Sequence, residues 1–156
     1  MPGHALSFCR HLAVGIGPAA DFMSGTVYTD IVNMAGFDRC CFIIERVTST
    51  GTSTITVEAS DDVSASNVSA IPFYSRDTTT GDTPGTFTSR AATGYIPAAG
   101  AELTEIEVDV AALSASGYHY VRLKAVESVN DPVVGSVLIE LYGARYSRTP
   151  DTTAIV

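Results

Sequence analysis

The sequence predicts an all-β protein, a two-sheet antiparallel β-sandwich of the jelly-roll or immunoglobulin-like kind with extended N- and C-terminal arms. Three observations predict this class: short stretches in which apolar and polar residues alternate, turn-forming Gly, Pro, Thr and Asp residues between them, and almost no helical period. The strictest alternation is Glu-Ile-Glu-Val-Asp-Val at 105–110. Successive side chains of a strand point to opposite faces, so Ile106, Val108 and Val110 share one buried face.

The stretch at 113–125 continues this pattern after a turn. Residues 111–117 are long enough for about one helical turn, which Gly117 closes before the chain re-enters the sheet. The strand that follows places Val121, Leu123 and Ala125 on one face. His119 falls on the same face, and we therefore expect it to be a hydrogen-bonded histidine of the core.

Further strands are expected wherever β-branched and aromatic residues cluster between turn signals. They cover residues 26–32, 40–44, 54–59, 71–76, 91–96 and 133–141, with a shorter strand near 85–88 in the polar excursion at 77–90. The strands at 40–44 and 54–59 are expected to form a hairpin across the turn at 50–52.

These strands define one domain with two flanking segments. Residues 1–25 contain repeated Gly and Pro and no convincing period, so they are expected to form an arm with at most one short strand near 12–16. The β-sandwich is expected to span 26–144. Residues 145–156 are polar and broken by Pro150, and they are expected to form a C-terminal tail.

Composition argues against several classes of function. The chain of 156 residues is 17% charged, below the roughly 25% typical of soluble domains. It has a net charge of −8 and only one lysine, Lys124, and its arginines are scattered singly, so we expect no nucleic-acid partner. No apolar run approaches the ~20 residues of a membrane span, and no signal peptide is expected.

Residues that carry chemistry are sparse. Cys9, Cys40 and Cys41 lack the spacing of a metal or redox motif and are expected to be free thiols. Glu58, together with the pair at 61–62, offers oxygen ligands for calcium, but without the spacing of a calcium loop the favoured interpretation is a solvated turn. No phosphate loop, nucleophile elbow or cofactor motif is present in the sequence, so we expect no catalytic residue, metal or cofactor.

Four stretches of the chain resemble small virion proteins of tailed bacteriophages. They are Gly-Thr-Val-Tyr-Thr-Asp-Ile-Val at 25–32, Gly-Thr-Ser-Thr-Ile-Thr-Val-Glu-Ala at 51–59 followed by Asp-Asp, Ile-Pro-Phe-Tyr at 71–74, and Ser-Gly-Tyr-His-Tyr-Val-Arg-Leu at 116–123. The resemblance extends over about 25–146 and includes the β-rich, lysine-poor composition. It carries no catalytic residue.

The resemblance implies a capsid decoration protein, which binds the outer surface of the major capsid lattice after assembly in the host cytoplasm. It further implies a homo-oligomer, with a trimer favoured. Because the strand at 40–44 is apolar on both faces, Cys40, Phe42 and Ile44 are the candidate subunit interface. A central strand buried within one subunit explains the same pattern equally well.

Two alternatives remain open. A tail or head-tail junction protein would share the same composition. A carbohydrate-binding module would present exposed aromatic side chains, for which Phe73, Tyr74, Phe87 and Tyr95 are the candidates. Packing inside the protein or at an interface is the favoured explanation of these four rings.

Overall fold

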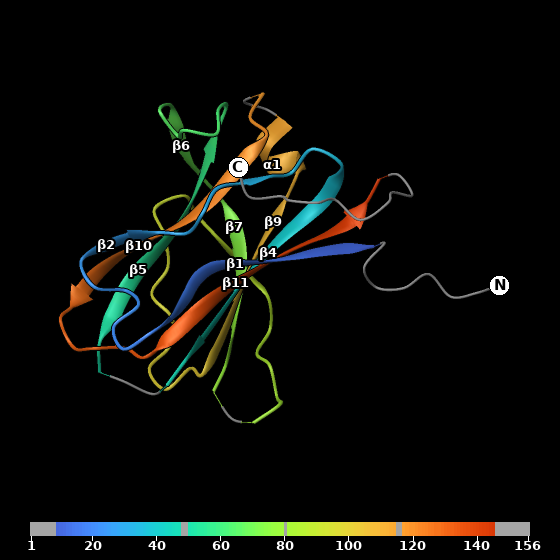
Figure 1. The fold of residues 1–156 in the computed structure, drawn as a ribbon. Coiled ribbons are helices and arrows are strands. Elements are labelled where there is room, and N and C mark those ends of the chain that lie inside the picture. The colour runs from blue at the N-terminus through green and yellow to red at the C-terminus, as the bar shows by residue number, and fades with distance from the viewer. Residues whose placement is uncertain (1–8, 48–49, 80, 115–116, 146–156) are drawn as a thin grey trace.

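Two antiparallel β-sheets pack face to face, which confirms the predicted all-β sandwich (Figure 1). The structure is a computed structural model and describes residues 9–47, 50–79, 81–114 and 117–145. The parts of the predicted arms at 1–8 and 146–156 lie outside the described residues. Within the described part of the chain, no helix is long and apolar enough to cross a membrane.

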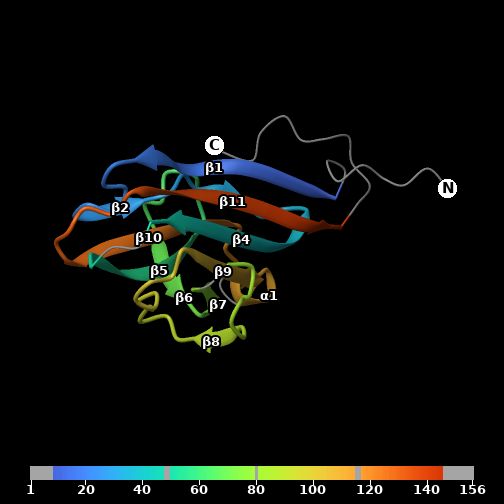
Figure 2. The same cartoon turned by 90° about the horizontal axis from the view of Figure 1, so that it is seen from below.

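The strands divide unequally between the two sheets (Figure 2). The six-stranded sheet has the order β1 (Arg10–Ala19), β11 (Gly135–Ala144), β4 (Phe37–Arg46), β9 (Leu103–Asp109), β7 (Phe73–Thr78) and β8 (Thr88–Arg90). The five-stranded sheet has the order β2 (Thr26–Tyr28), β10 (Tyr120–Val129), β5 (Thr52–Ser60) and β6 (Val68–Ile71), and β3 (Val32–Asn33) also pairs with β10. A single turn of helix, α1 (Ala111–Ser114), follows β9, as the sequence predicts.

The strand pairings are nested: the strands from β1 to β5 pair in reverse order with strands that follow them in the chain, as in one long hairpin. β1 pairs with β11, β2 and β3 pair with β10, β4 pairs with β9, and β5 pairs with β6. Rolling such a hairpin into two sheets produces a jelly roll, so the structure selects that topology over the immunoglobulin-like one. β7 and β8 extend the six-stranded sheet beyond this framework.

The core lies between the two sheets and contains the apolar faces that the alternation predicts. Its largest fully buried side chains come from both sheets and include Phe42, Ile44, Ile55, Ile106, Leu123, Ile139 and Leu141. Each fully buried aliphatic or aromatic side chain contributes about 1.5–3 kcal/mol of transfer free energy. This burial is the main source of stability, because the described part of the chain contains no disulfide.

The predicted strand at 26–32 is interrupted at Thr29, which lies between β2 and β3. The Thr29 backbone N–H donates to the Leu123 carbonyl at 3.0 Å, and the Leu123 N–H donates to Thr29 Oγ1 at 3.0 Å. The side-chain hydroxyl therefore supplies the acceptor that a regular ladder would take from the backbone, so the buried Leu123 amide stays paired at the break.

The predicted N-terminal boundary of the sandwich is wrong. β1 begins at Arg10 and pairs with β11 from Tyr142 to Gly135, so the sheet starts within the segment expected to be an arm. Gly15 is one of the glycines that led to the expectation of an arm, and it allows β1 to approach β11. A Cβ on Gly15 would lie 2.9 Å from Ile139 Cγ1, and only glycine admits so close an approach.

The predicted hairpin of 40–44 with 54–59 is also wrong. β4 lies in the six-stranded sheet and β5 in the five-stranded sheet, so the connection between them crosses from one layer to the other. Gly51 lies at the end of this crossing, where a Cβ would meet the Asp131 carbonyl oxygen at 2.1 Å. Alternation indicates which side chains face inward, but it does not indicate which sheet a strand joins.

We predict that Phe42→Ala lowers the free energy of unfolding by about 3–5 kcal/mol, because it opens a cavity between the sheets. The matched control is Leu12→Ala on β1, whose side chain is 52% exposed and whose loss should change stability by less than about 0.5 kcal/mol. Guanidinium unfolding followed by circular dichroism measures both changes. Equal effects of the two substitutions would contradict the assigned core.

Candidate functional site

The outer face of the six-stranded sheet carries a layer of charged side chains. Since β4 buries Cys40, Phe42 and Ile44, its alternate residues Arg39 and Cys41 point outward. The ladder aligns them with outward residues of the neighbouring strands. The resulting charged layer consists of Arg10, Arg39, Arg76, Glu105, Glu107, Asp109 and Glu140.

Every carboxylate of the charged layer has an arginine partner. Arg10 Nη1 lies 2.9 Å from Glu140 Oε1, and Arg76 Nη2 donates to Glu105 Oε1 at 2.9 Å. Arg39 bridges two acids, because it pairs with Glu107 and lies 3.1 Å from Asp109 Oδ2. These pairs are partly exposed, so each contributes at most about 1 kcal/mol. Their main effect is to neutralise the acids and hold the side chains in place.

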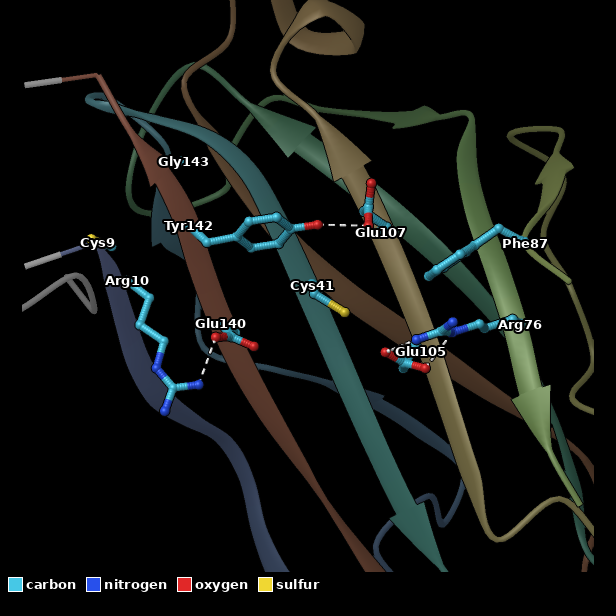
Figure 3. A pocket seen from close by; sticks show the side chains of 10 residues that line it. All are labelled: Cys9, Arg10, Cys41, Arg76, Phe87, Glu105, Glu107, Glu140, Tyr142 and Gly143. Carbon is cyan, nitrogen blue, oxygen red and sulfur yellow. Dashed lines mark hydrogen bonds and ion pairs between the residues drawn. The ribbon is translucent and has the colours of Figure 1, made fainter. Parts of the chain in front are cut away.

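A hollow of about 490 Å³ lies over this layer, with Cys41 at its centre (Figure 3). Tyr142 crosses its floor and donates its hydroxyl to Glu107 Oε2 at 2.6 Å. Burial, followed by the hydrogen bond to this carboxylate, raises the pKa of Tyr142 above its ordinary value. The phenol therefore stays protonated at neutral pH and serves as a donor.

The Cys41 thiol in this hollow stays protonated at neutral pH. Burial, followed by the negative charges of Glu105, Glu107 and Glu140, raises the pKa of Cys41 to about 12. A thiol attacks as the thiolate, which is scarce so far below the pKa. The lining includes no histidine, and its carboxylates already accept from arginines. The exposed thiol of Cys9 lies at the edge of the same hollow.

The predicted subunit interface of Cys40, Phe42 and Ile44 is wrong. All three side chains have no exposed surface, because β4 lies between β11 and β9 and turns this face toward the other sheet. The alternative explanation of the apolar pattern, a central strand buried within one subunit, is the one found. A contact with another protein must use a different face.

The four candidate aromatic residues are separated by the structure. Phe73 is buried in the core, and Tyr95 is half-buried, where its hydroxyl donates to Asp77. Burial, followed by that hydrogen bond, raises the pKa of Tyr95 to about 12. Tyr74 and Phe87 are exposed on the outer face of the six-stranded sheet. Only these two remain candidates for contact with a ligand.

Two further predictions concern His119 and the acidic cluster near Glu58. His119 is exposed and lies just before β10, so the prediction of a core histidine is wrong. Its backbone still bonds to Ser60 and Met34, but its side chain lies beyond the buried face of β10, which begins at Val121. Glu58 is buried, with Oε2 2.7 Å from Arg122 Nη2 and Oε1 3.2 Å from Lys124 Nζ. It does not belong to the nearby turn, in which the Asp62 carboxylate accepts a hydrogen bond from the Ser64 hydroxyl. In the described part of the chain, no group of three His, Cys, Asp or Glu residues could hold a metal ion.

An apolar stripe crosses the other half of the outer face and was not predicted. Val14 lies opposite Leu138, which lies opposite Ile43, and Leu12 projects beside them from β1. Leu12 is 52% exposed and Val14 is 53% exposed. The alternation of Leu12 and Val14 in the sequence is a signal for this surface, but the neighbouring glycines and Pro18 obscure it.

Comparison of the chain with protein-family models, curated proteins and solved structures finds no match. Among the described residues, no buried side-chain nitrogen or oxygen lacks a hydrogen-bond partner, so no unsatisfied group in the interior awaits a ligand. The surface features that remain are the charged layer with its hollows and the apolar stripe.

We predict that iodoacetamide at pH 8 modifies Cys9 rapidly and leaves Cys40 and Cys41 unmodified until the protein unfolds. Cys9 is exposed, whereas burial raises the pKa of both other thiols far above this pH. Peptide mass spectrometry with and without guanidinium measures the three sites separately. Modification of Cys41 in the native protein at the rate of Cys9 would show that this thiol is accessible and ionised.

Proposed function

We propose that this protein is a non-enzymatic structural component of a bacteriophage virion, a decoration protein that binds the outer surface of the major capsid lattice and stabilises the head. The proposal rests on the resemblance of 25–146 to small phage virion proteins together with the surface described above. Binding to the assembled shell would stabilise it by the free energy of each contact, multiplied over many copies.

The observation that carries the proposal is the apolar stripe beside an edge strand. Leu12 and Val14 are exposed, and the half-buried Leu138 and Ile43 continue this apolar surface across the neighbouring strands, which in a soluble protein is typical of a contact site. β1 pairs with β11 on one side and forms an edge of the sheet on the other. On the edge side, the Gly15 carbonyl accepts a hydrogen bond from the Asp30 N–H at 3.3 Å. An edge of this kind offers backbone hydrogen bonds to a partner strand.

Charge and fold are compatible with this location. A net charge of −8 favours the outside of a shell over an interior lined with nucleic acid. Jelly rolls occur in viral capsid proteins and in lectins, although a fold alone does not define a function. In the hollow around Cys41 the carboxylates are already paired with arginines, which favours a role in binding and assembly.

The principal alternative is a protein of the tail or of the head-tail junction. The same apolar stripe would serve either location, and the two differ in copy number, with hundreds of copies expected on the head and six or twelve at a junction. A homo-oligomer, with a trimer favoured, remains part of the proposal. Because β4 is buried, its subunit contact would involve the outer faces or the sheet edges.

We predict that Val14→Asp weakens binding to capsid shells lacking this protein by at least about tenfold, equivalent to about 1.4 kcal/mol, because it places a charge in the apolar contact. The matched control is Val126→Asp on the outer face of the five-stranded sheet, where Val126 is 38% exposed. The control should change affinity by no more than about twofold. Cosedimentation with shells measures both.

Unchanged binding of Val14→Asp would exclude the apolar stripe as the capsid contact. Absence of binding by the unmodified protein would exclude the decoration function itself. Circular dichroism spectra of both variants establish that each is folded before its binding is compared.

A further inference from the structure

A second hollow, of about 520 Å³, lies on the outer face of the six-stranded sheet at the end opposite the apolar stripe. Its size falls within the roughly 300–1,000 Å³ of small-molecule sites. The side chains that matter for its chemistry are Arg39, Tyr74, Phe87, Ser89, Glu107 and Asp109. They combine two exposed aromatic rings with a set of charged groups that are already paired with one another.

The two rings are brought together by the register of β7 and β8. Tyr74 lies opposite Ser89, and the same register brings Phe87, two residues earlier, opposite Arg76. Tyr74 is 47% exposed and Phe87 is 37% exposed. The Arg76 guanidinium lies 4.4 Å from the centroid of the Phe87 ring and is itself held by Glu105, so the ring is supported in one orientation.

The polar wall of the hollow is similarly fixed. Glu107 accepts from Arg39 and from the Tyr142 hydroxyl, and Asp109 Oδ1 accepts from the Ala111 N–H at 2.9 Å. A carboxylate has about four acceptor sites and a guanidinium five donors, so these groups retain capacity for further hydrogen bonds. The wall thus places guanidinium donors beside carboxylate acceptors in fixed positions. A hydroxyl group can both donate and accept a hydrogen bond, so it suits such a wall.

The charge of this wall selects among polyhydroxylated ligands. One arginine faces two carboxylates, Glu107 and Asp109, so the lining is not positive, and an acidic sugar would be repelled by both the wall and the net charge of −8. A neutral pyranose presents an apolar C–H face to an aromatic ring and hydroxyls at its rim. The apolar face of the sugar matches the aromatic rings of the hollow, and its hydroxyls match the polar wall.

We propose that this hollow, with Tyr74 and Phe87 as the aromatic contacts and Arg39, Glu107 and Asp109 as the hydroxyl contacts, binds a saccharide unit of a neutral glycan. The site lies over β9, β7 and β8 and includes Arg39 near the start of β4, whereas the apolar stripe lies over β1, β11 and the later part of β4 around Ile43. A molecule attached through the stripe therefore leaves the saccharide site open. The inference goes beyond attachment to a capsid and does not depend on it.

Affinity electrophoresis in native gels tests the site. The probes are the neutral polysaccharides dextran, yeast mannan, galactomannan and hydroxyethyl cellulose, with the polyuronate alginate as the acidic comparison. We expect at least one neutral polymer to retard the full-length protein, and we expect Tyr74→Ala and Phe87→Ala each to weaken that retardation at least tenfold. Alginate should not retard the protein.

The matched control is Tyr28→Ala. Tyr28 is 44% exposed and lies 4.2 Å from the Arg122 guanidinium, a setting similar to that of Phe87, but it belongs to the five-stranded sheet. Its substitution should leave retardation unchanged. Absence of retardation in all four neutral polymers, an equal loss in Tyr28→Ala, or stronger retardation in alginate would each overturn the proposal. Capsid binding by the same variants should be unaffected, which separates this test from that of the decoration function.

Discussion

The burial of two apolar sheet faces against each other is the interaction on which the rest of the structure depends. It fixes the register of every strand, because a shift of one residue would turn the core face of that strand toward solvent. On β4, burial of Phe42 and Ile44 directs Arg39 and Cys41 outward. The outer face is thus a consequence of the core, and its side chains are held on a rigid support.

The two halves of that outer face have different chemistry. Over β9 and β7, arginines and carboxylates pair across neighbouring strands and hold one another in place, while contributing little net stability. Over β1 and β11 the charged layer continues only with the Arg10–Glu140 pair, and Leu12 and Val14 beside it leave apolar surface exposed. We therefore propose polar recognition for one half of this face and burial against a protein for the other.

Sequence patterns predicted the features that are local. The alternation around Ile106 and Leu123 correctly gave strands and inward faces, because it reports burial directly. The jelly-roll order could not be obtained in this way, since β1 and β11 pair across more than a hundred residues. The sequence named Tyr74 and Phe87 as candidate ligand contacts, but it did not predict the charged wall beside them, because Glu107 comes opposite Tyr74 only through the pairing of β7 with β9.

The most direct test of the proposed role is the copy number of this protein in purified particles, measured by quantitative mass spectrometry against the major capsid protein. A ratio near one, or a simple fraction of one, is the result expected for a protein that binds across the capsid lattice through its outer face. A dozen copies or fewer per particle would place it at the head-tail junction or tail and contradict this account, and its absence from particles would exclude any virion role.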